Sequence, residues 1–418
     1  MNSFYKKLAN IFVGALVIRL LFALICPLTA PDTETYAQLG IHLVEDGVLS
    51  LDGHTHYPRY APLYPFLIGL SRAVSGMPYW PVRILQCFLD ALTCVMCGLI
   101  ARRFFSERAA VLTAVFCALL PHLVVSASCI LTETVYTFLL VLCFYLIAVP
   151  RLSAGRSIAG GLALGLANLC RPVSLLLPVV FMGVVFFRKS RQRIRSGFLL
   201  MVASAVLAVV PTIVINYAYT GALIPVAVGS GFNLWVGSYR PWDGDYNWKD
   251  LSDKEAIEQG RSLVKADREF RKEALRNIRE NPLWYAWLVV RKIPRLWLDI
   301  PGSREVLADK PLVLYAGLVF HNLFLLLCGA GWFLWVRREH RQYGWNALQY
   351  SLPGVLITVT IVYFTGMHVF FLAIPRYVIP VLPLCAVFAG FAVCCAADRC
   401  CGRHDDPPTE NPSDGLRT

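Results

Sequence analysis

Long apolar stretches alternate along the chain with short polar or basic segments. A bilayer core of about 30 Å needs roughly 20 apolar residues per helix, so the pattern predicts about ten membrane spans in the 418 residues. The fifth and sixth stretches are short and predict a hairpin broken at Arg171-Pro172, because proline disfavours helix at the residue before it. The predicted spans are residues 8–28, 81–101, 109–125, 133–149, 157–170, 173–187, 197–217, 312–336, 346–372 and 378–397.

Composition narrows the class of protein. Hydrophobic residues make up 57% of the chain and charged residues only 16%, against about 45–50% and about 25% in soluble domains. These proportions exclude an ordinary soluble enzyme, a disordered chain and a fibrous protein. The expected fold class is an all-α integral membrane protein, with membrane-lying helices in its two long outer loops.

The basic residues predict how the chain lies in the membrane. The net charge of +12 would suggest a nucleic-acid partner in a soluble protein, but the positive-inside rule explains basic runs between apolar stretches. No nucleic-acid partner is therefore expected. Both termini are predicted to be cytoplasmic, with long outer loops at 29–80 and 218–311. Residues 1–397 form one predicted transmembrane domain, and 398–418 a short disordered cytoplasmic tail. The basic segments are Lys6 and Lys7, Arg102 and Arg103, Arg151 and Arg156, 188–195, 337–341 and the tail after Arg399.

The first outer loop begins with an acid at a predicted helix start. Asp32 precedes Tyr36, Leu39 and Leu43, which fall on one helical face, and Gly47 is a plausible stop. Two interpretations of Asp32 stay open. It is either a simple N-cap, or a carboxylate just above the bilayer that faces both a lipid headgroup and a water-borne acceptor.

The same loop continues into a second predicted interfacial helix. Pro62 suits a first helical position, Phe66 and Leu70 supply an apolar face, and Gly76 ends the pattern. Arg59 stands just before this helix. A guanidinium there can hold a phosphate through two parallel hydrogen bonds, or it makes an ordinary phospholipid contact.

Further ionisable residues lie at the predicted outer edge of the spans. Glu133 opens the fourth span, where an acid also suits a helix N-terminus. Arg171 lies at an outer turn, and Arg376-Tyr377 at the outer start of the last span. Arginines are expected less often on this face, so several of them there suggest an anion held at the outer leaflet.

The second outer loop contains a glycine-rich turn and two predicted helices. The turn carries Asn233 and Trp235, which suit either a sugar-contacting turn or a plain one. Residues 253–280 predict a charged amphipathic helix, and 284–297 combine tryptophans with basic residues, as in helices at a membrane surface.

Together, these segments resemble the C-type (GT-C) polytopic glycosyltransferases, which use polyprenyl-phosphate sugars. The nearest branches are the family 39 protein O-mannosyltransferases and the aminoarabinose transferase that modifies lipid A. The protein mannosyltransferases carry adjacent Asp-Glu in the first loop, whereas Thr33 separates Asp32 from Glu34 here. The segments that carry the resemblance are 32–36, 59–65, Thr132-Glu133, 165–172, the Asn-Leu-Trp turn and Arg376-Tyr377.

The resemblance implies an inverting transfer of a sugar from a polyprenyl phosphate to an acceptor hydroxyl at the outer face. A carboxylate base and cations that receive the leaving phosphate would carry the reaction. We expect no metal and no other cofactor. The expected base is Asp32, with Glu133 or Glu34 as partner or substitute; Arg59, Arg171, Arg376 and Tyr377 would bind the donor phosphate, and Tyr36, Tyr64, Asn233 and Trp235 the substrates.

The expected location is the bacterial inner membrane, with the site on the periplasmic face. The expected partners are a lipid-linked sugar, membrane lipid and an acceptor that is a glycan, lipid or protein. Two alternatives stay open. One is a lipid flippase or transporter, for which Arg19, Asp90 and Asn168 are candidate residues near the midplane. The other is a polymerase or ligase of surface polysaccharide.

Overall fold

The computed structural model describes residues 3–149, 152–187, 192–239, 262–300, 311–344 and 351–400. Within these ranges the regular elements are helices, with one isolated bridge between Ser50 and His56. The predicted all-α class is therefore confirmed. Residues 188–191, 253–261, 346–350 and 401–418, which belong to predicted segments, lie outside the described ranges.

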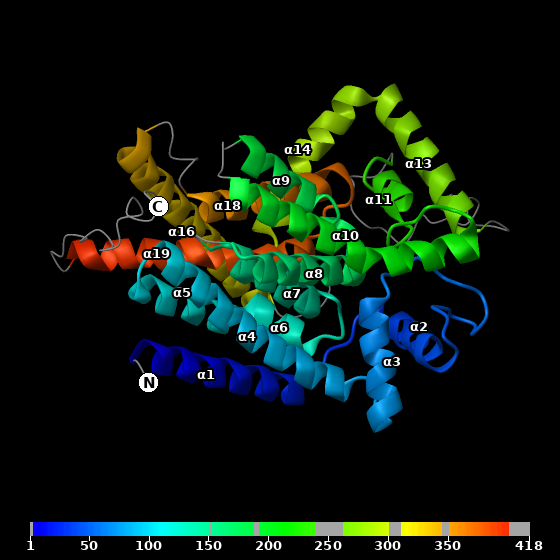
Figure 1. Cartoon of the computed structure of the whole chain (residues 1–418), viewed down its shortest axis with the longest axis horizontal. Coiled ribbons are helices and arrows are strands. Elements are labelled where there is room, and N and C mark those ends of the chain that lie inside the picture. The colour runs from blue at the N-terminus through cyan, green and yellow to red at the C-terminus, as the bar shows by residue number, and fades with distance from the viewer. Residues whose placement is uncertain are drawn as a thin grey trace.

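In chain order (Figure 1) the helices are α1 (Ser3–Ile25), α2 (Thr33–Glu45), α3 (Leu63–Ser75), α4 (Trp80–Phe104), α5 (Glu107–Leu119), α6 (Pro121–Ser128), α7 (Glu133–Ile147), α8 (Ala154–Cys170), η1 (Pro172–Ser174), α9 (Leu177–Phe187), α10 (Gln192–Thr220), α11 (Ser230–Val236), α13 (Leu263–Glu280), α14 (Pro282–Leu298), α16 (Pro311–Tyr343), α18 (Leu352–Phe370), η3 (Pro375–Val381) and α19 (Leu382–Cys400).

Each predicted span corresponds to a helix or a bent helix pair. Among the described residues, six helices are long and apolar enough to cross a membrane, and the bent pair of α5 and α6 makes a seventh candidate. The apolar helices α7 and α9 are shorter. The chain is therefore a multi-pass membrane protein.

Prolines divide two of the predicted spans. The third bends by 49° between α5 and α6, where Pro121 starts the second helix and lacks the amide that would continue the first. At the predicted break, α8 ends at Cys170 and a short 3-10 turn, η1, follows. The expected break at Arg171-Pro172 is confirmed.

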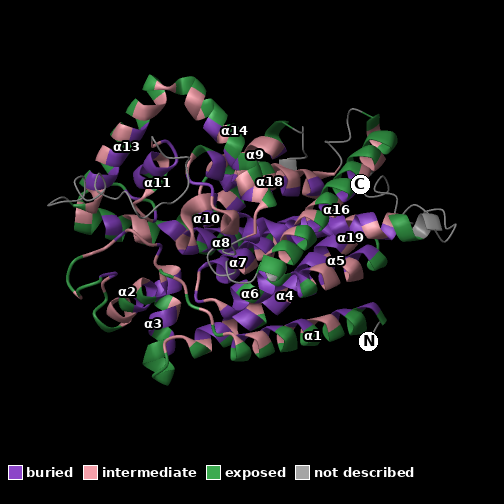
Figure 2. Ribbon diagram, turned by 180° about the vertical axis from the view of Figure 1, so that it is seen from behind, coloured by how far each residue is buried: buried purple, intermediate pink, exposed green. Residues whose placement is uncertain are grey.

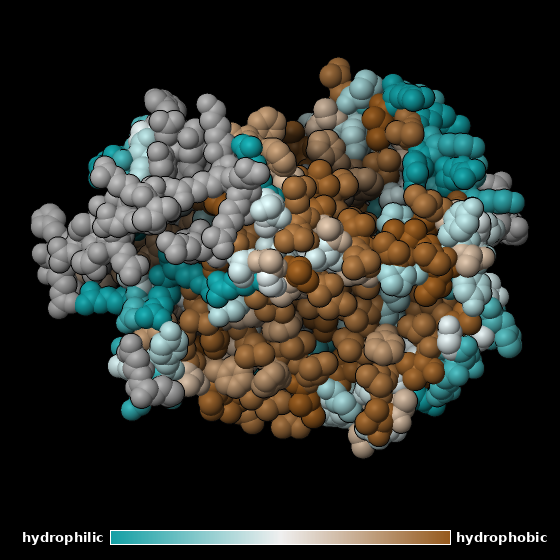
Figure 3. All heavy atoms as spheres, viewed as in Figure 1, coloured by the Kyte–Doolittle hydropathy of each residue, from teal (hydrophilic) through white to brown (hydrophobic). Residues whose placement is uncertain are grey.

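The outer loops and the termini lie at opposite ends of the molecule. In Figures 1 and 2, both ends of the described chain lie at one end of the long axis, and α2, α3, α11 and α13 lie at the other. Figure 3 shows a broad apolar surface between more polar regions at the two ends. An apolar surface of this kind is expected where helices face lipid.

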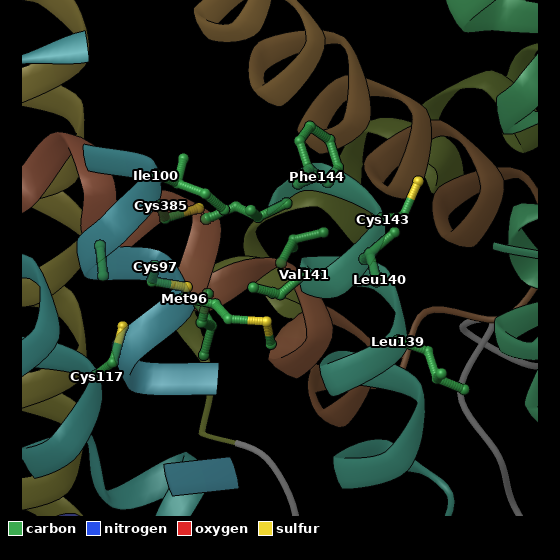
Figure 4. Close-up of a cluster of buried hydrophobic side chains, with 14 of the residues drawn as sticks. Met96, Cys97, Ile100, Cys117, Leu139, Leu140, Val141, Cys143, Phe144 and Cys385 are labelled. Atoms are coloured by element: carbon green, nitrogen blue, oxygen red, sulfur yellow. The ribbon is translucent and has the colours of Figure 1, made fainter. Parts of the chain in front are cut away.

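Small apolar side chains fill the centre of the helix bundle. Cys97 and Cys117 are fully buried and, in Figure 4, lie in the cluster that also contains Ile100 and Phe144. The ten cysteines from Cys26 to Cys385 are free thiols. They lie mostly in apolar stretches, where they act as small hydrophobic residues.

The buried charges of the bundle neutralise each other. Arg19 of α1 pairs with Asp90 of α4, and both side chains are inaccessible to solvent. Arg19 also donates to the backbone carbonyls of Ala118 at 3.0 Å and Cys117 at 3.2 Å. This pair ties three helices together, as expected for charges inside a membrane domain.

In the first outer loop, two glycines let α2 and α3 cross closely. A Cβ added to Gly40 would lie 2.1 Å from the carbonyl oxygen of Pro65, and one added to Gly69 would lie 1.9 Å from that of Gly40. The crossing fixes α2 against α3. The two interfacial helices predicted for this loop are both present.

Candidate active site

Arg83 of α4 fastens together the two chain segments that carry the outer acids. It donates to the carbonyl of Leu28 at 2.9 Å and to that of Ser128 at 3.0 Å. Leu28 lies shortly before Asp32, and Ser128 shortly before Glu133. Arg83 is itself buried, so its hydrogen bonds hold the two segments side by side at the outer end of α4.

Asp32 precedes α2 but does not cap it. Its backbone is in the helical region and its side chain makes no capping hydrogen bond, whereas an N-cap residue is usually extended. Instead, Oδ1 accepts a hydrogen bond from the hydroxyl of Tyr60 at 3.2 Å. Oδ2 lies 3.6 Å from Nη2 of Arg376. The capping interpretation is therefore wrong, and the carboxylate faces the second half of the loop and the last span.

The hydroxyl of Tyr60 is held in its protonated form. Burial, and then the neighbouring Asp32 carboxylate, raise the pKa of Tyr60 well above its ordinary value. Tyr60 therefore donates to Asp32 throughout the physiological pH range.

Glu133 lies between two arginines. It is 2% exposed, and its Oε1 is 2.7 Å from Nη1 of Arg171 and 3.8 Å from Nε of Arg376. Burial disfavours a charged Arg171, but the Glu133 carboxylate outweighs burial and raises the pKa of Arg171. Two carboxylates and two guanidinium groups, from Asp32, Glu133, Arg171 and Arg376, thus form one cluster.

Two nitrogen atoms of the guanidinium groups lack an aligned hydrogen bond. Nη1 of Arg171 and Nε of Arg376 are buried, and neither makes an aligned hydrogen bond. Their contacts with Glu133 are ion pairs by distance alone. Because buried donors normally have aligned partners, these two nitrogen atoms leave the cluster with room for a further acceptor.

Aromatic rings form a wall beside Asp32. The ring of Tyr36 packs edge-on against Tyr60 and Tyr64, with both centroid distances 5.2 Å. The hydroxyl of Tyr64 donates to Gln86 of α4 at 2.6 Å. Tyr36 and Tyr64 are both buried, so this wall fixes the position of Tyr60.

Tyr377 lies under the arginines. The guanidinium of Arg171 is 5.0 Å from the centre of the Tyr377 ring, and that of Arg376 is 5.8 Å away. His368 of α18 packs against Tyr377 at a centroid distance of 4.6 Å. The ring thereby supports both cations, which is a role of contact and charge rather than one of direct catalysis.

Arg59 is oriented by the second outer loop. Its guanidinium lies over the ring of Phe232 in α11, 4.8 Å from the centroid. Two further contacts join the loops nearby: the amide of Val228 donates to Pro58 at 2.7 Å, and His56 bonds to Asn216 at 2.8 Å. The contact with Phe232 thus places Arg59 against α11, next in the chain to Tyr60.

Three of the expected residues make their contacts elsewhere. Glu34 is exposed and accepts a hydrogen bond from Tyr79 at 3.0 Å. Trp235 is 3% exposed and packs against Tyr239 and Phe270, so its faces are not open to a sugar. Asn233 lies on the exposed side of α11. The described contacts bring none of the three to the Asp32 cluster.

Sequence reasoning missed two residues that shape the site. Tyr60 follows Arg59 directly, and its place in that segment was a signal that could have identified it. Arg83 resembles an ordinary residue near the end of a span, and no pattern distinguishes it. In the part of the chain that the structure describes, no three His, Cys, Asp or Glu side chains are grouped as metal ligands.

The chain resembles two kinds of known structure over most of its length. ArnT from Cupriavidus metallidurans, bound to undecaprenyl phosphate, is 17% identical with a TM-score of 0.55, covering 94% of this chain and 61% of ArnT. The archaeal oligosaccharyltransferase AglB from Archaeoglobus fulgidus, in complex with an inhibitory peptide and a dolichol-phosphate, is 14% identical with a TM-score of 0.54, covering 97% of this chain and 53% of AglB.

The chain has the GT-C fold. The resemblance expected from the sequence is thus confirmed at the level of the fold. The profile of the dolichyl-phosphate-mannose-protein mannosyltransferase family also matches residues 58–215, which include Arg59, Glu133 and Arg171. No match was found among curated protein sequences. The chain spans about three fifths of ArnT and about half of AglB.

Proposed function

We propose that this chain transfers a sugar from a polyprenyl-phosphate donor to an acceptor hydroxyl, with inversion at the anomeric carbon. The observation that carries the proposal is the cluster at the outer end of the bundle. Asp32 faces Arg376 there, and the guanidinium groups of Arg171 and Arg376 keep buried donors without aligned partners. The GT-C fold and the lipid phosphates bound by ArnT and AglB support this reading.

Asp32 is the proposed general base. The acceptor O–H gives its proton to the Asp32 carboxylate while its oxygen bonds to the anomeric carbon, and a carboxylate base contributes about 10²–10⁴-fold. The bond from that carbon to the phosphate oxygen breaks, and its electron pair leaves with the polyprenyl phosphate. Asp32 then releases the proton to water. Tyr60 orients the carboxylate through its hydrogen bond.

The arginines receive the charge of the leaving group. A phosphodiester that becomes a monoester gains negative charge, which preorganised cations stabilise. Arg376 and Arg171 supply these cations in the cluster, and Arg59 is a third candidate beside Tyr60. Glu133 acts as a fixed counter-ion that holds Arg171 and Arg376 in position. We do not assign it the base role, because both neighbours keep it charged and occupied.

The proposed location is the bacterial inner membrane, with the cluster at the periplasmic face and both termini in the cytoplasm. Basic residues near the described termini support this orientation through the positive-inside rule. Lys6, Lys7, Arg102 and Arg103 lie at the end of the bundle opposite α2 and α3. The donor lipid would then reach the cluster from the outer leaflet.

The polar residues of the bundle give little support to a flippase or transporter. Arg19 and Asp90 are paired with each other, and Asn168 accepts a hydrogen bond from Ser174 at 2.8 Å. A transport pathway near the midplane needs polar groups that are open to a substrate. A polysaccharide polymerase or ligase shares the outer site and is distinguished by its donor.

The test is transfer by the purified protein in nanodiscs. We expect radiolabelled sugar to leave a polyprenyl monophosphate donor, either to a cell-envelope extract as acceptor or, more slowly, to water. Transfer only from a diphosphate-linked oligosaccharide would favour a polymerase or ligase. Movement of intact donor between the leaflets of proteoliposomes, with no cleavage, would contradict the proposal.

A further inference from the structure

Lys292 of α14 is a buried cation that does not belong to the cluster of Asp32, Glu133, Arg171 and Arg376. It is 1% exposed. Its ammonium donates to the carbonyl of Gly237 at 2.6 Å and to that of Phe371 at 2.8 Å. Burying an ammonium costs several kcal/mol unless its partners are well placed. The two backbone carbonyls are the partners that offset this cost, so Lys292 is specifically placed to bind them.

Both carbonyls belong to helix ends. Gly237 is the C-cap of α11 and Phe371 the C-cap of α18, and the last carbonyls of a helix lack partners within the helix. The two ends approach closely because residue 237 is glycine. A Cβ there would lie 1.8 Å from the Phe371 oxygen and 3.0 Å from the ammonium of Lys292. One ammonium thus joins two helices at a contact that only glycine permits.

The joined segment leads directly to the candidate site. Phe371 begins the short connection to η3, which carries Arg376. Within the connection, Leu372 and Ile374 pack against the aromatic cluster of α11 and α13. The ion pairs of Arg376 are long, at 3.6 and 3.8 Å. At these distances they attract the guanidinium without a hydrogen bond of fixed geometry, so its exact position also depends on how the backbone of this connection is held.

The other end of α11 is held by a charge of opposite sign. Asp267 of α13 is 7% exposed and accepts a hydrogen bond from the amide of Phe232 at 3.1 Å. Phe232 is the ring on which Arg59 lies. Asp267 and Lys292 therefore clamp a seven-residue helix at its two ends. One end supports Arg59, and the other supports the segment before Arg376.

We propose that Lys292 is a positioning residue, which fixes the backbone at Phe371 so that Arg376 is held ready for the donor phosphate. The donor-binding part of this inference rests on the proposed function. The anchoring part concerns the backbone alone and is measurable without any substrate. A 1 Å misplacement of a binding group can cost about 100-fold, which sets the scale of the expected effect.

Hydrogen exchange tests the anchoring part. In Lys292→Met, a substitution that keeps length and removes charge, we expect the amides of residues 372–378 to exchange at least about tenfold faster. In Lys292→Arg, whose guanidinium can reach both carbonyls, we expect near-normal protection. Lys272→Met is the matched control, since Lys272 is an exposed residue of α13 paired only with Glu269 in the described contacts. Unchanged exchange in folded Lys292→Met protein would overturn the inference.

A double-mutant cycle tests the link to Arg376. The measured quantity is the Kd for undecaprenyl phosphate in nanodiscs. We expect Lys292→Met and Arg376→Ala each to raise the Kd about 10- to 100-fold, and the double variant to bind no more weakly than Arg376→Ala. Additive losses would show that Lys292 does not act through Arg376, and would reject that link. Wild-type protein that binds no lipid phosphate, but shows the exchange effect, would reject the proposed function and retain the anchoring role.

Discussion

The guanidinium of Arg376 lies 3.6 Å from the carboxylate of Asp32, although the two residues stand near opposite ends of the chain. This distance is too long for a hydrogen bond but short enough for strong attraction at low dielectric. Arg376 is therefore held near Asp32 without being saturated by it. In the proposed reaction, such an arrangement would leave the cation able to meet a phosphate while the carboxylate faces the acceptor.

Replacing Asp32 with asparagine should abolish transfer. The amide keeps the shape of the carboxylate but cannot take the proton of the acceptor, so we expect a loss of about 10²–10⁴-fold in kcat. The measurement is the initial rate of transfer at saturating donor. Glu34→Gln is the matched control, because Glu34 is exposed and contacts Tyr79. Full turnover by Asp32→Asn would remove it from the base role.

Removing the cation at Arg376 should affect the donor more than the acceptor. We expect Arg376→Ala to lower kcat/KM for the polyprenyl-phosphate sugar by about 100-fold, because the charge that develops on the leaving phosphate loses a preorganised cation. The KM for the acceptor should change little. Steady-state kinetics, with the donor and then the acceptor concentration varied, separate the effect on the donor from the effect on the acceptor. Equal effects on both substrates would argue against a phosphate role.

Neutralising Glu133 should destabilise the protein as well as slow it. The side chain is 3% exposed, and Glu133→Gln leaves Arg171 and Arg376 without their shared counter-ion. Breaking a buried pair in this way costs about 3–5 kcal/mol, so we expect a clear fall in the thermal unfolding temperature in detergent. Glu133→Asp, which keeps the negative charge, should show a smaller fall in the unfolding temperature. An unchanged unfolding temperature for Glu133→Gln would show that the pair adds no stability.

Tyr60 should remain a hydrogen-bond donor up to high pH. Its pKa is raised by burial and by Asp32, so its stabilising contribution is fully present below the ordinary tyrosine pKa of about 10 and is lost only as pH rises through the folded value. We therefore expect Tyr60→Phe to lower kcat/KM by a factor that is constant between about pH 6.5 and 9. If the ratio of wild-type to Tyr60→Phe kcat/KM instead changed with pH, with a midpoint in this range, Tyr60 would not be the constant donor to Asp32.

Adding a side chain where α2 and α3 cross should lower both stability and activity, although the crossing makes no contact with the Asp32 cluster in the contacts described above. In Gly69→Ala the added Cβ would lie 1.9 Å from the carbonyl oxygen of Gly40, which forces the helices apart. Because overpacking typically costs about 1–3 kcal/mol, we expect lower stability and lower transfer activity. Gly14→Ala is the control, since a Cβ there meets nothing within 4 Å. Equal activity and stability of the two variants would show that the crossing tolerates separation.

Much of the fold follows from local sequence features. Apolar length predicted the spans, and the proline at Pro172 predicted the break after α8. The stop expected at Gly76 is present as a left-handed C-cap, with φ of 70°. These features depend on residues that are neighbours in the chain, so their physical causes can be read without knowing the rest of the molecule.

The sequence by itself determined the class of the protein and the candidates for its chemistry, and it predicted the outer placement of the acids and arginines. Only the tertiary structure decided that Asp32 turns to Arg376 rather than capping α2, and that Trp235 is buried against Phe270. It also decided that Lys292 joins α11 to α18. Local periodicity fixes which residues face lipid or core, but the partner of a buried charge depends on how distant helices pack.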